Sequence, residues 1–148
     1  MSRLAAEHQA INLSQGFPDF DCAPELRALV TKHFNAGVNQ YPPMAGIAPL
    51  REAVAEKIAS LYGTAYDPEQ EVTIVPGATY AIYTAVAALI RPGDEVILFE
   101  PTYDSYGPAV EVHGGIPVYV QLRYPDYSID WQAVQAAITP RTKLMIIN

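Results

Sequence analysis

A short turn, Gly77-Ala78-Thr79, holds the residues best suited to bind an anion. An apolar, β-type run at 72–75 stops at Pro76, and a helical pattern begins near Thr79. The turn is therefore expected to direct backbone N–H groups and a hydroxyl at one point before a helix N-terminus, which suits a phosphate. An ordinary turn with Thr79 as a helix cap is the alternative. The turn matches neither a Walker loop nor G-x-G-x-x-G.

Three other residues stand where a ligand could be met. Tyr103 follows a predicted strand, and its ring could stack on a flat heterocycle outside the carboxyl end of a parallel sheet. Tyr41 lies on a proline-rich loop, from which its hydroxyl could reach a phosphate, including one held by a neighbouring subunit. Gly16 offers a backbone N–H that no Cβ obstructs. The alternatives are that Tyr103 only shields the surface, that Tyr41 only packs its loop, and that Gly16 only forms a turn.

Other catalytic constellations are not predicted. The three histidines fall on different predicted elements, and with the single cysteine they show no metal-ligand spacing, so no metal site is expected. The chain has no Ser-His-Asp or G-x-S-x-G pattern. None of the lysines on helix faces or at a strand start is predicted to form a Schiff base; these are Lys32, Lys57 and Lys143.

Composition restricts the class of protein and its partners. The 148 residues are 50% hydrophobic and 17% charged, which is enough apolar material for about one packed domain. A net charge of −7 argues against nucleic acid or an anionic membrane as a partner. No apolar run approaches the roughly 20 residues that span a bilayer. The lone Cys22 favours a reducing, cytoplasmic setting.

The elements that must position these residues follow from periodicity and turn signals. After an extended arm at 11–23, helices are predicted at 24–34, 49–62, 79–90 and 103–113, with a last helix capped by Asp130; strands are predicted at 72–75, 96–99, 116–120 and 143–147. Beyond residue 70 strands and helices alternate, which predicts an α/β fold with a mostly parallel sheet flanked by helices. The apolar residues expected to face inward on two of these helices are Ile82, Val86, Leu89, Ile90, Trp131, Val134 and Ile138.

Several segments taken together resemble one family, the class I/II aminotransferases of pyridoxal-phosphate fold type I, with methionine and kynurenine aminotransferases as the nearest subgroups. The segments that carry the resemblance occur in the family's order and spacing, and they are 11–20 (INLSQGFPDF), 39–41 (NQY), 49–53 (PLREA), 77–79 (GAT), 92–96 (PGDEV), 100–106 (EPTYDSY) and 141–143 (RTK).

The resemblance implies a domain division and a set of roles. Residues 1–38 would be an N-terminal arm and helix of the small domain, and residues 39–148 the N-terminal portion of the large, pyridoxal 5'-phosphate-binding domain. Its implied site residues are Gly77, Ala78 and Thr79 on the cofactor phosphate, Tyr103 stacked on the pyridine ring, Tyr41 on the phosphate of the partner subunit, Gly16 at the substrate carboxylate, and Asn148 as the first asparagine of an Asn-x-Pro-x-Asn-Pro motif.

The resemblance also implies that the chain is a fragment. The Schiff-base lysine, the aspartate on the pyridinium nitrogen and the substrate-clamping arginine have no counterpart among the 148 residues, so no catalytic residue is assigned and the chain alone is expected to be inactive. The full-length protein would be a homodimer that acts on an amino acid and a 2-oxo acid. A cysteine-conjugate β-lyase on the same fold and a non-catalytic phosphate-ligand binding module are the alternatives, and the DNA downstream of Asn148 would separate the second.

Truncation has an expected structural cost. The runs at 96–99 and 116–120 could pair with each other, whereas those at 72–75 and 143–147 would lack their normal neighbours. Unpaired apolar strands expose backbone donors and apolar surface, so the isolated chain is expected to aggregate or to remain molten.

Overall fold

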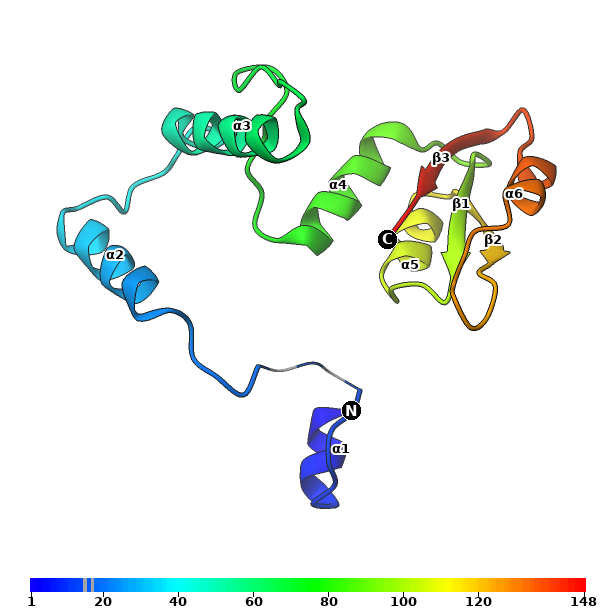
Figure 1. The fold of residues 1–148 in the computed structure, drawn as a ribbon, viewed down its shortest axis with the longest axis horizontal. Coiled ribbons are helices and arrows are strands. Elements are labelled where there is room, and N and C mark those ends of the chain that lie inside the picture. Colours follow the sequence, from blue (N-terminus) through cyan, green and yellow to red (C-terminus); the bar gives the residue numbers. More distant parts are fainter. Residues whose placement is uncertain (15, 17) are drawn as a thin grey trace. The chain divides into compact units, whose positions relative to one another are not determined.

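A computed structural model describes residues 1–14, 16 and 18–148 (Figure 1). Gln15 and Phe17, which belong to the 11–20 motif, lie outside the described residues. The chain divides into two compact units, Met1–Pro42 and Pro43–Asn148. No helix in the described ranges combines the length and the hydropathy needed to cross a bilayer.

The first unit contains two helices and the extended arm between them. Helix α1 spans Ser2–Glu7, and α2 spans Pro24–Asn35, which matches the helix predicted at 24–34 closely. Proline at the first position of α2 suits a helix start because its missing N–H would have no intrahelical partner there. No residue of α2 is buried, so its apolar stripe is exposed; the stripe consists of Leu26, Leu29, Val30 and Phe34.

The second unit alternates helices and strands. Its elements are α3 (Ala48–Tyr62), α4 (Ala78–Leu89), β1 (Glu95–Glu100), α5 (Tyr106–Val112), β2 (Ile116–Gln121), α6 (Trp131–Ala137) and β3 (Thr142–Ile146). Helix α3 ends at Gly63 in the left-handed conformation, and α6 begins at Asp130, whose side chain accepts bonds from the N–H groups of Gln132 and Ala133. Both boundary signals were readable in the sequence.

The three strands form a parallel sheet in the order β2-β1-β3. Central strand β1 is buried on both faces, as its continuous apolar run predicts. Val96 and Leu98 pack with α4 and α5 on one face, while Ile97 and Phe99 pack with α6 on the other. Figure 1 shows α5 and α6 on opposite sides of this sheet. The predicted α/β architecture with flanking helices is confirmed.

Two of the predicted strands behave differently from expectation. Residues 72–75 form no strand, and Ile74 N instead donates to Ala45 O at 3.0 Å. An apolar run becomes a strand only beside a partner, and the described residues offer it none. The run at 143–147, which is expected to lack its normal neighbours, forms β3 and pairs with β1. The predicted pairing of 96–99 with 116–120 is confirmed.

Several helix details also differ. Helix α5 starts at Tyr106 rather than 103, because Tyr106 N first closes a turn on Tyr103 O. Of the residues expected to face inward on α6, only Val134 is buried; Trp131 is 61% exposed, and Ile138 has already left the helix. The inward face of the seven-residue α6 consists instead of Val134 and of Ala137, which is partly buried and packs against the same cluster. On α4, Val86 and Ile90 are buried one turn apart, but Leu89 lies at the edge of that stripe and is exposed.

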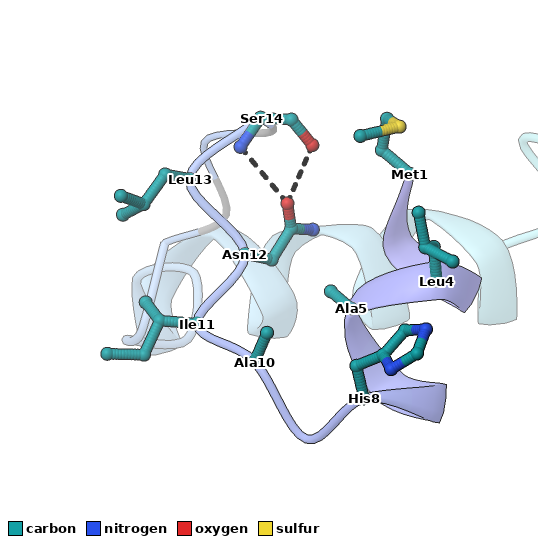
Figure 2. Close-up of a pocket in the computed structure, with 9 residues that line it drawn as sticks. All are labelled: Met1, Leu4, Ala5, His8, Ala10, Ile11, Asn12, Leu13 and Ser14. Carbon is teal, nitrogen blue, oxygen red and sulfur yellow. Dashed lines mark hydrogen bonds between the residues drawn. The ribbon is translucent and has the colours of Figure 1, made fainter.

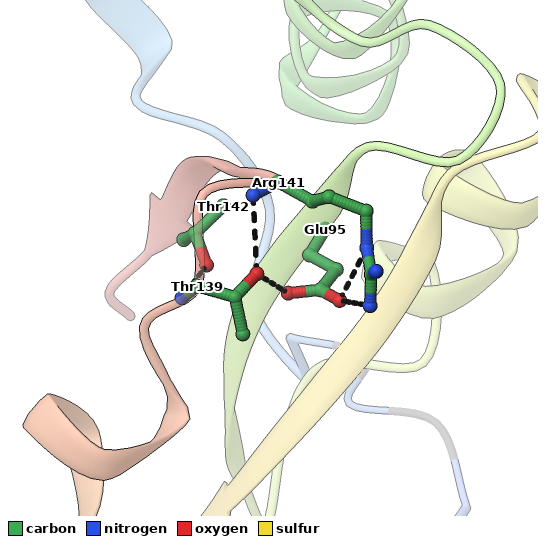
Figure 3. Close-up of polar contacts among 4 residues, drawn as sticks. All are labelled: Glu95, Thr139, Arg141 and Thr142. Carbon is green, nitrogen blue, oxygen red and sulfur yellow. Dashed lines mark hydrogen bonds and ion pairs between the residues drawn. The ribbon is translucent and has the colours of Figure 1, made fainter.

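A polar cluster fastens β1 to β3 at the ends where both strands begin (Figure 3). Glu95 is 4% exposed, and its carboxylate accepts bonds from Thr139 Oγ1 and from Arg141 Nε, the latter at 2.9 Å. Arg141 also forms an ion pair with Glu95, and Thr139 N donates to Thr142 Oγ1. The Thr139 hydroxyl, followed by Arg141, lowers the pKa of Glu95 below its usual 4.5, so this buried carboxylate stays charged.

Candidate functional site

The N-terminus of α4 has the geometry of an anion-binding site. Gly77 precedes it with φ +97° and ψ 159°, a conformation open essentially to glycine alone. The first intrahelical bond runs from Ala81 N to Gly77 O, so the preceding N–H groups of Ala78, Thr79 and Tyr80 have no acceptor within the helix. No side chain among the described residues caps them. A Cβ on Gly77 would meet nothing within 4 Å, which leaves open space at the positive end of the helix dipole.

The Thr79 hydroxyl is available at this helix start. The capping position belongs to Gly77, so the alternative in which Thr79 caps the helix is wrong. Thr79 lines a hollow of about 310 Å³ between α4 and α5, which it shares with Tyr83, Ser105, Pro108, Ala109 and Val112. The structure therefore places Thr79, at the start of α4, on one side of this hollow.

Ser105 adds a polar atom that the sequence reasoning missed. Its Oγ is buried and has no hydrogen-bond partner in the part of the chain that the structure describes. A buried hydroxyl without a partner costs free energy, so a ligand or ordered water on this side of the hollow would relieve that cost. The signal that could have found it is position, because Ser105 belongs to the 100–106 motif that follows β1.

Tyr103 lies beyond the carboxyl end of β1, as predicted, but does not line the Thr79 hollow. Its side chain is 52% exposed, and its ring meets that of Tyr106 edge-on, with centroids 5.7 Å apart and planes at 69°. The exposed part of the ring is free to stack on a ligand. The structure thus places Tyr103 two residues from Ser105, on the loop bordering the hollow, but not in one hollow with Thr79.

A second hollow lies at the carboxyl end of β1, on the face covered by α6. It measures about 270 Å³ and is lined by Phe99, Pro101, Leu122, Tyr127, Ile129, Ile147 and Asn148. The Asn148 side chain accepts a hydrogen bond from the Tyr106 hydroxyl at 2.8 Å. Ligands of parallel α/β sheets bind beyond this edge, so the edge carries polar and aromatic groups where the fold favours binding.

The remaining two predicted site residues belong to the first unit. Tyr41 is 99% exposed, and a Cβ on Gly16 would meet nothing within 4 Å. Figure 2 shows a hollow beside α1, near which Asn12 Oδ1 accepts bonds from Ser14 N at 3.1 Å and Ser14 Oγ at 2.7 Å. These bonds hold the segment just before Gly16. Tyr41 and Gly16 thus lie in the first unit, whereas Thr79 lies in the second.

Metal-ligating side chains do not gather in the described ranges, where no group of three His, Cys, Asp or Glu could hold a metal ion. His113 instead bonds Ala109 O through Nδ1 at 2.8 Å and packs against the Tyr83 ring. Cys22 is a free, exposed thiol.

Comparison with known proteins identifies the family to which this chain belongs. Residues 8–148 match the family described as aminotransferase class I and II. The chain is 50% identical over 148 residues to the methionine aminotransferase of Escherichia coli K12 and 35% identical over 161 residues to mouse kynurenine–oxoglutarate transaminase 1. The matches cover 100% and 99% of this chain, and each spans 38% of the relative.

A solved structure of another aminotransferase also resembles this chain. The N-succinyldiaminopimelate aminotransferase of Mycobacterium tuberculosis superposes with a TM-score of 0.94 at 48% identity, over 100% of this chain and 39% of that one. The chain thus spans a little over a third of the length of these relatives, and its α/β fold is that of the corresponding part of a fold type I aminotransferase. It belongs to the class I and II aminotransferase family.

Proposed function

We propose that the complete product of this gene's reading frame is a pyridoxal 5'-phosphate-dependent aminotransferase. It would move an amino group from an amino acid to a 2-oxo acid, with methionine, an aromatic amino acid or kynurenine as the donor. Support comes from the family and from relatives that are named as methionine and kynurenine aminotransferases.

The observation that carries the proposal is the open α4 N-terminus behind Gly77. The residues present fit the phosphate of the cofactor, because α4 begins without a side-chain cap and the space around a Cβ built on Gly77 is open. In the proposal, the N–H groups of Ala78 and Thr79 and the Thr79 hydroxyl hold this phosphate. Tyr103 covers the pyridine ring with the exposed part of its own.

When bound, the cofactor supplies an electron sink for the carbon that carries the amino group. The described residues bind and orient it; we assign the covalent anchor to none of Lys32, Lys57 and Lys143, and we expect residues 1–148 by themselves to be inactive. Gly16 would donate its N–H to the substrate carboxylate.

A homodimer is part of the proposal. The side chain of Tyr41 is exposed almost completely on a stiff proline-rich loop, as expected of a group that acts on a second subunit. Its hydroxyl would donate to the cofactor phosphate held by the partner. The free, exposed thiol of Cys22 fits the cytoplasmic setting that we also propose.

The test uses the complete product, loaded with pyridoxal 5'-phosphate and assayed with amino acid and 2-oxo acid pairs. We expect a visible-edge absorption band of the bound cofactor and turnover that depends on the 2-oxo acid. Release of pyruvate and ammonia without a 2-oxo acid would favour the β-lyase, and absence of the band would refute the proposal.

A variant pair tests the phosphate-binding site itself. Thr79→Val removes a hydroxyl proposed to bond a charged group, so the cofactor should bind about ten-fold more weakly. Thr84→Val makes the same change at an exposed position further along α4 and should leave binding unchanged. Equal dissociation constants for the two variants would remove Thr79 from the site.

A further inference from the structure

Tyr106, the first residue of α5, joins two distant parts of the carboxyl edge of the sheet. Its side chain is 8% exposed and belongs to the core cluster with Val96, Leu98 and Val110. A buried phenol needs a partner for its hydroxyl, and this one donates to Asn148 Oδ1 at 2.8 Å, across 42 positions of sequence. The start of α5 is thereby tied to the chain as it leaves β3.

The same ring also contacts Tyr103. The two rings meet edge-on at 5.7 Å, which is a favourable geometry for an aromatic pair. Because the ring of Tyr106 is buried in the core, it provides a fixed surface against which the half-exposed ring of Tyr103 packs. One side chain therefore contacts two groups at this edge, the half-exposed ring of Tyr103 and the amide of Asn148, which lines the second hollow.

We propose that Tyr106 is a positioning residue, whose ring orients Tyr103 and whose hydroxyl sets the direction of the chain at Asn148. The inference rests on the proposed function, in which the Tyr103 ring covers the pyridine ring. The hydroxyl is the informative atom. Phenylalanine would fill nearly the same core volume, so packing alone explains why a ring stands at this position. Packing does not explain the hydroxyl, whose role is the hydrogen bond to Asn148.

The experiment compares variants of the complete gene product. Tyr106→Phe keeps the ring and removes the bond, Asn148→Ala removes its acceptor, and Tyr106→Leu removes ring and bond together. Tyr124→Phe, at a side chain that is 85% exposed, is the matched control for the loss of a phenol hydroxyl. The measurements are the cofactor dissociation constant, the visible circular dichroism of the bound cofactor, which reports its orientation, and the unfolding midpoint.

We expect Tyr106→Phe and Asn148→Ala each to bind the cofactor more weakly, by up to about five-fold, because the free energy of one neutral hydrogen bond within the protein sets the upper limit of the effect. Both should change its circular dichroism, and the double variant should add little to either single one. Tyr106→Leu should change the circular dichroism further, because Tyr103 then loses its support. The control should match the unmodified protein.

Two results would overturn the inference and are distinguishable. If the unmodified protein binds no pyridoxal 5'-phosphate, the proposed function fails and the inference falls with it. If that protein binds the cofactor and Tyr106→Phe and Asn148→Ala match it in affinity and circular dichroism, then Tyr106 only packs the core. A fall in the unfolding midpoint alone, for any variant, counts as that second result.

Discussion

Replacement of Gly77 by alanine tests the anion-binding site most directly. The glycine has φ +97° and ψ 159°, where any residue with a Cβ is strained by roughly 1–3 kcal/mol. The added methyl group would meet no atom within 4 Å, so the cost comes from the backbone and not from a clash. The chain can relieve this strain only by rotating the peptide that aims the N–H groups of Ala78 and Thr79.

This rotation should weaken cofactor binding by a calculable amount. Loss of one well-aligned bond to a charged phosphate costs about 1.5–3 kcal/mol, which raises the dissociation constant roughly ten- to a hundred-fold. The assay titrates the apo form of the complete gene product with pyridoxal 5'-phosphate, followed by absorbance. Thermal unfolding of the same apo protein reports the strain separately.

Gly93 provides the matched control. It too has a positive φ, +88°, and open space where a Cβ would lie, but it stands in the turn before β1. The 12-residue α4, about 18 Å long, separates that turn from Gly77. Gly93→Ala should lower the unfolding midpoint and leave the dissociation constant within about two-fold of the original. If the two variants weakened binding equally, or if Gly77→Ala left it unchanged, the reasoning about α4 would be refuted.

Three further predictions follow from packing and charge. Glu95→Gln should be less stable than the unmodified protein above about pH 4.5, because the folded state lowers the pKa of Glu95 and so favours its charged form. This difference in unfolding free energy should disappear as the pH falls through the lower pKa of the folded state. Denaturant titrations from pH 7 to 3 measure the difference, and a constant value would contradict the prediction. Leu98→Ala, at a fully buried position, should lower the unfolding free energy by about 2–5 kcal/mol, as measured by denaturant titration. The control Val112→Ala, at an exposed position, should change it by about zero. Similar losses in both variants would show that the core is loosely packed. Tyr103→Leu should raise the cofactor dissociation constant about three- to ten-fold and Tyr103→Phe should not, with equal behaviour of the two pointing away from ring stacking.

Local signals in the sequence predicted local structure well. Asp130 caps α6 through the N–H groups of Gln132 and Ala133, and Gly63 ends α3, because each effect involves only neighbouring residues. The continuous apolar run of β1 likewise indicates burial on both faces, which the structure confirms.

Features that depend on a distant partner could not be predicted in the same way. The run at 72–75 has the composition of a strand and forms none, whereas β3 finds its place beside β1. The bond between Tyr106 and Asn148 and the buried hydroxyl of Ser105 depend on how α5 settles against the sheet. Within the candidate site, the position of the turn before α4 was readable, but the separation of Thr79 and Tyr103 was not.

The outer side of β3 has a practical consequence. Within the described ranges β3 pairs only with β1, so its other side presents a row of backbone donors and acceptors. Strand addition uses such a row: an extended peptide in the right register docks through main-chain bonds, and its alternate side chains give selectivity. The free edge of β3 is therefore the place at which an added strand would extend the described sheet.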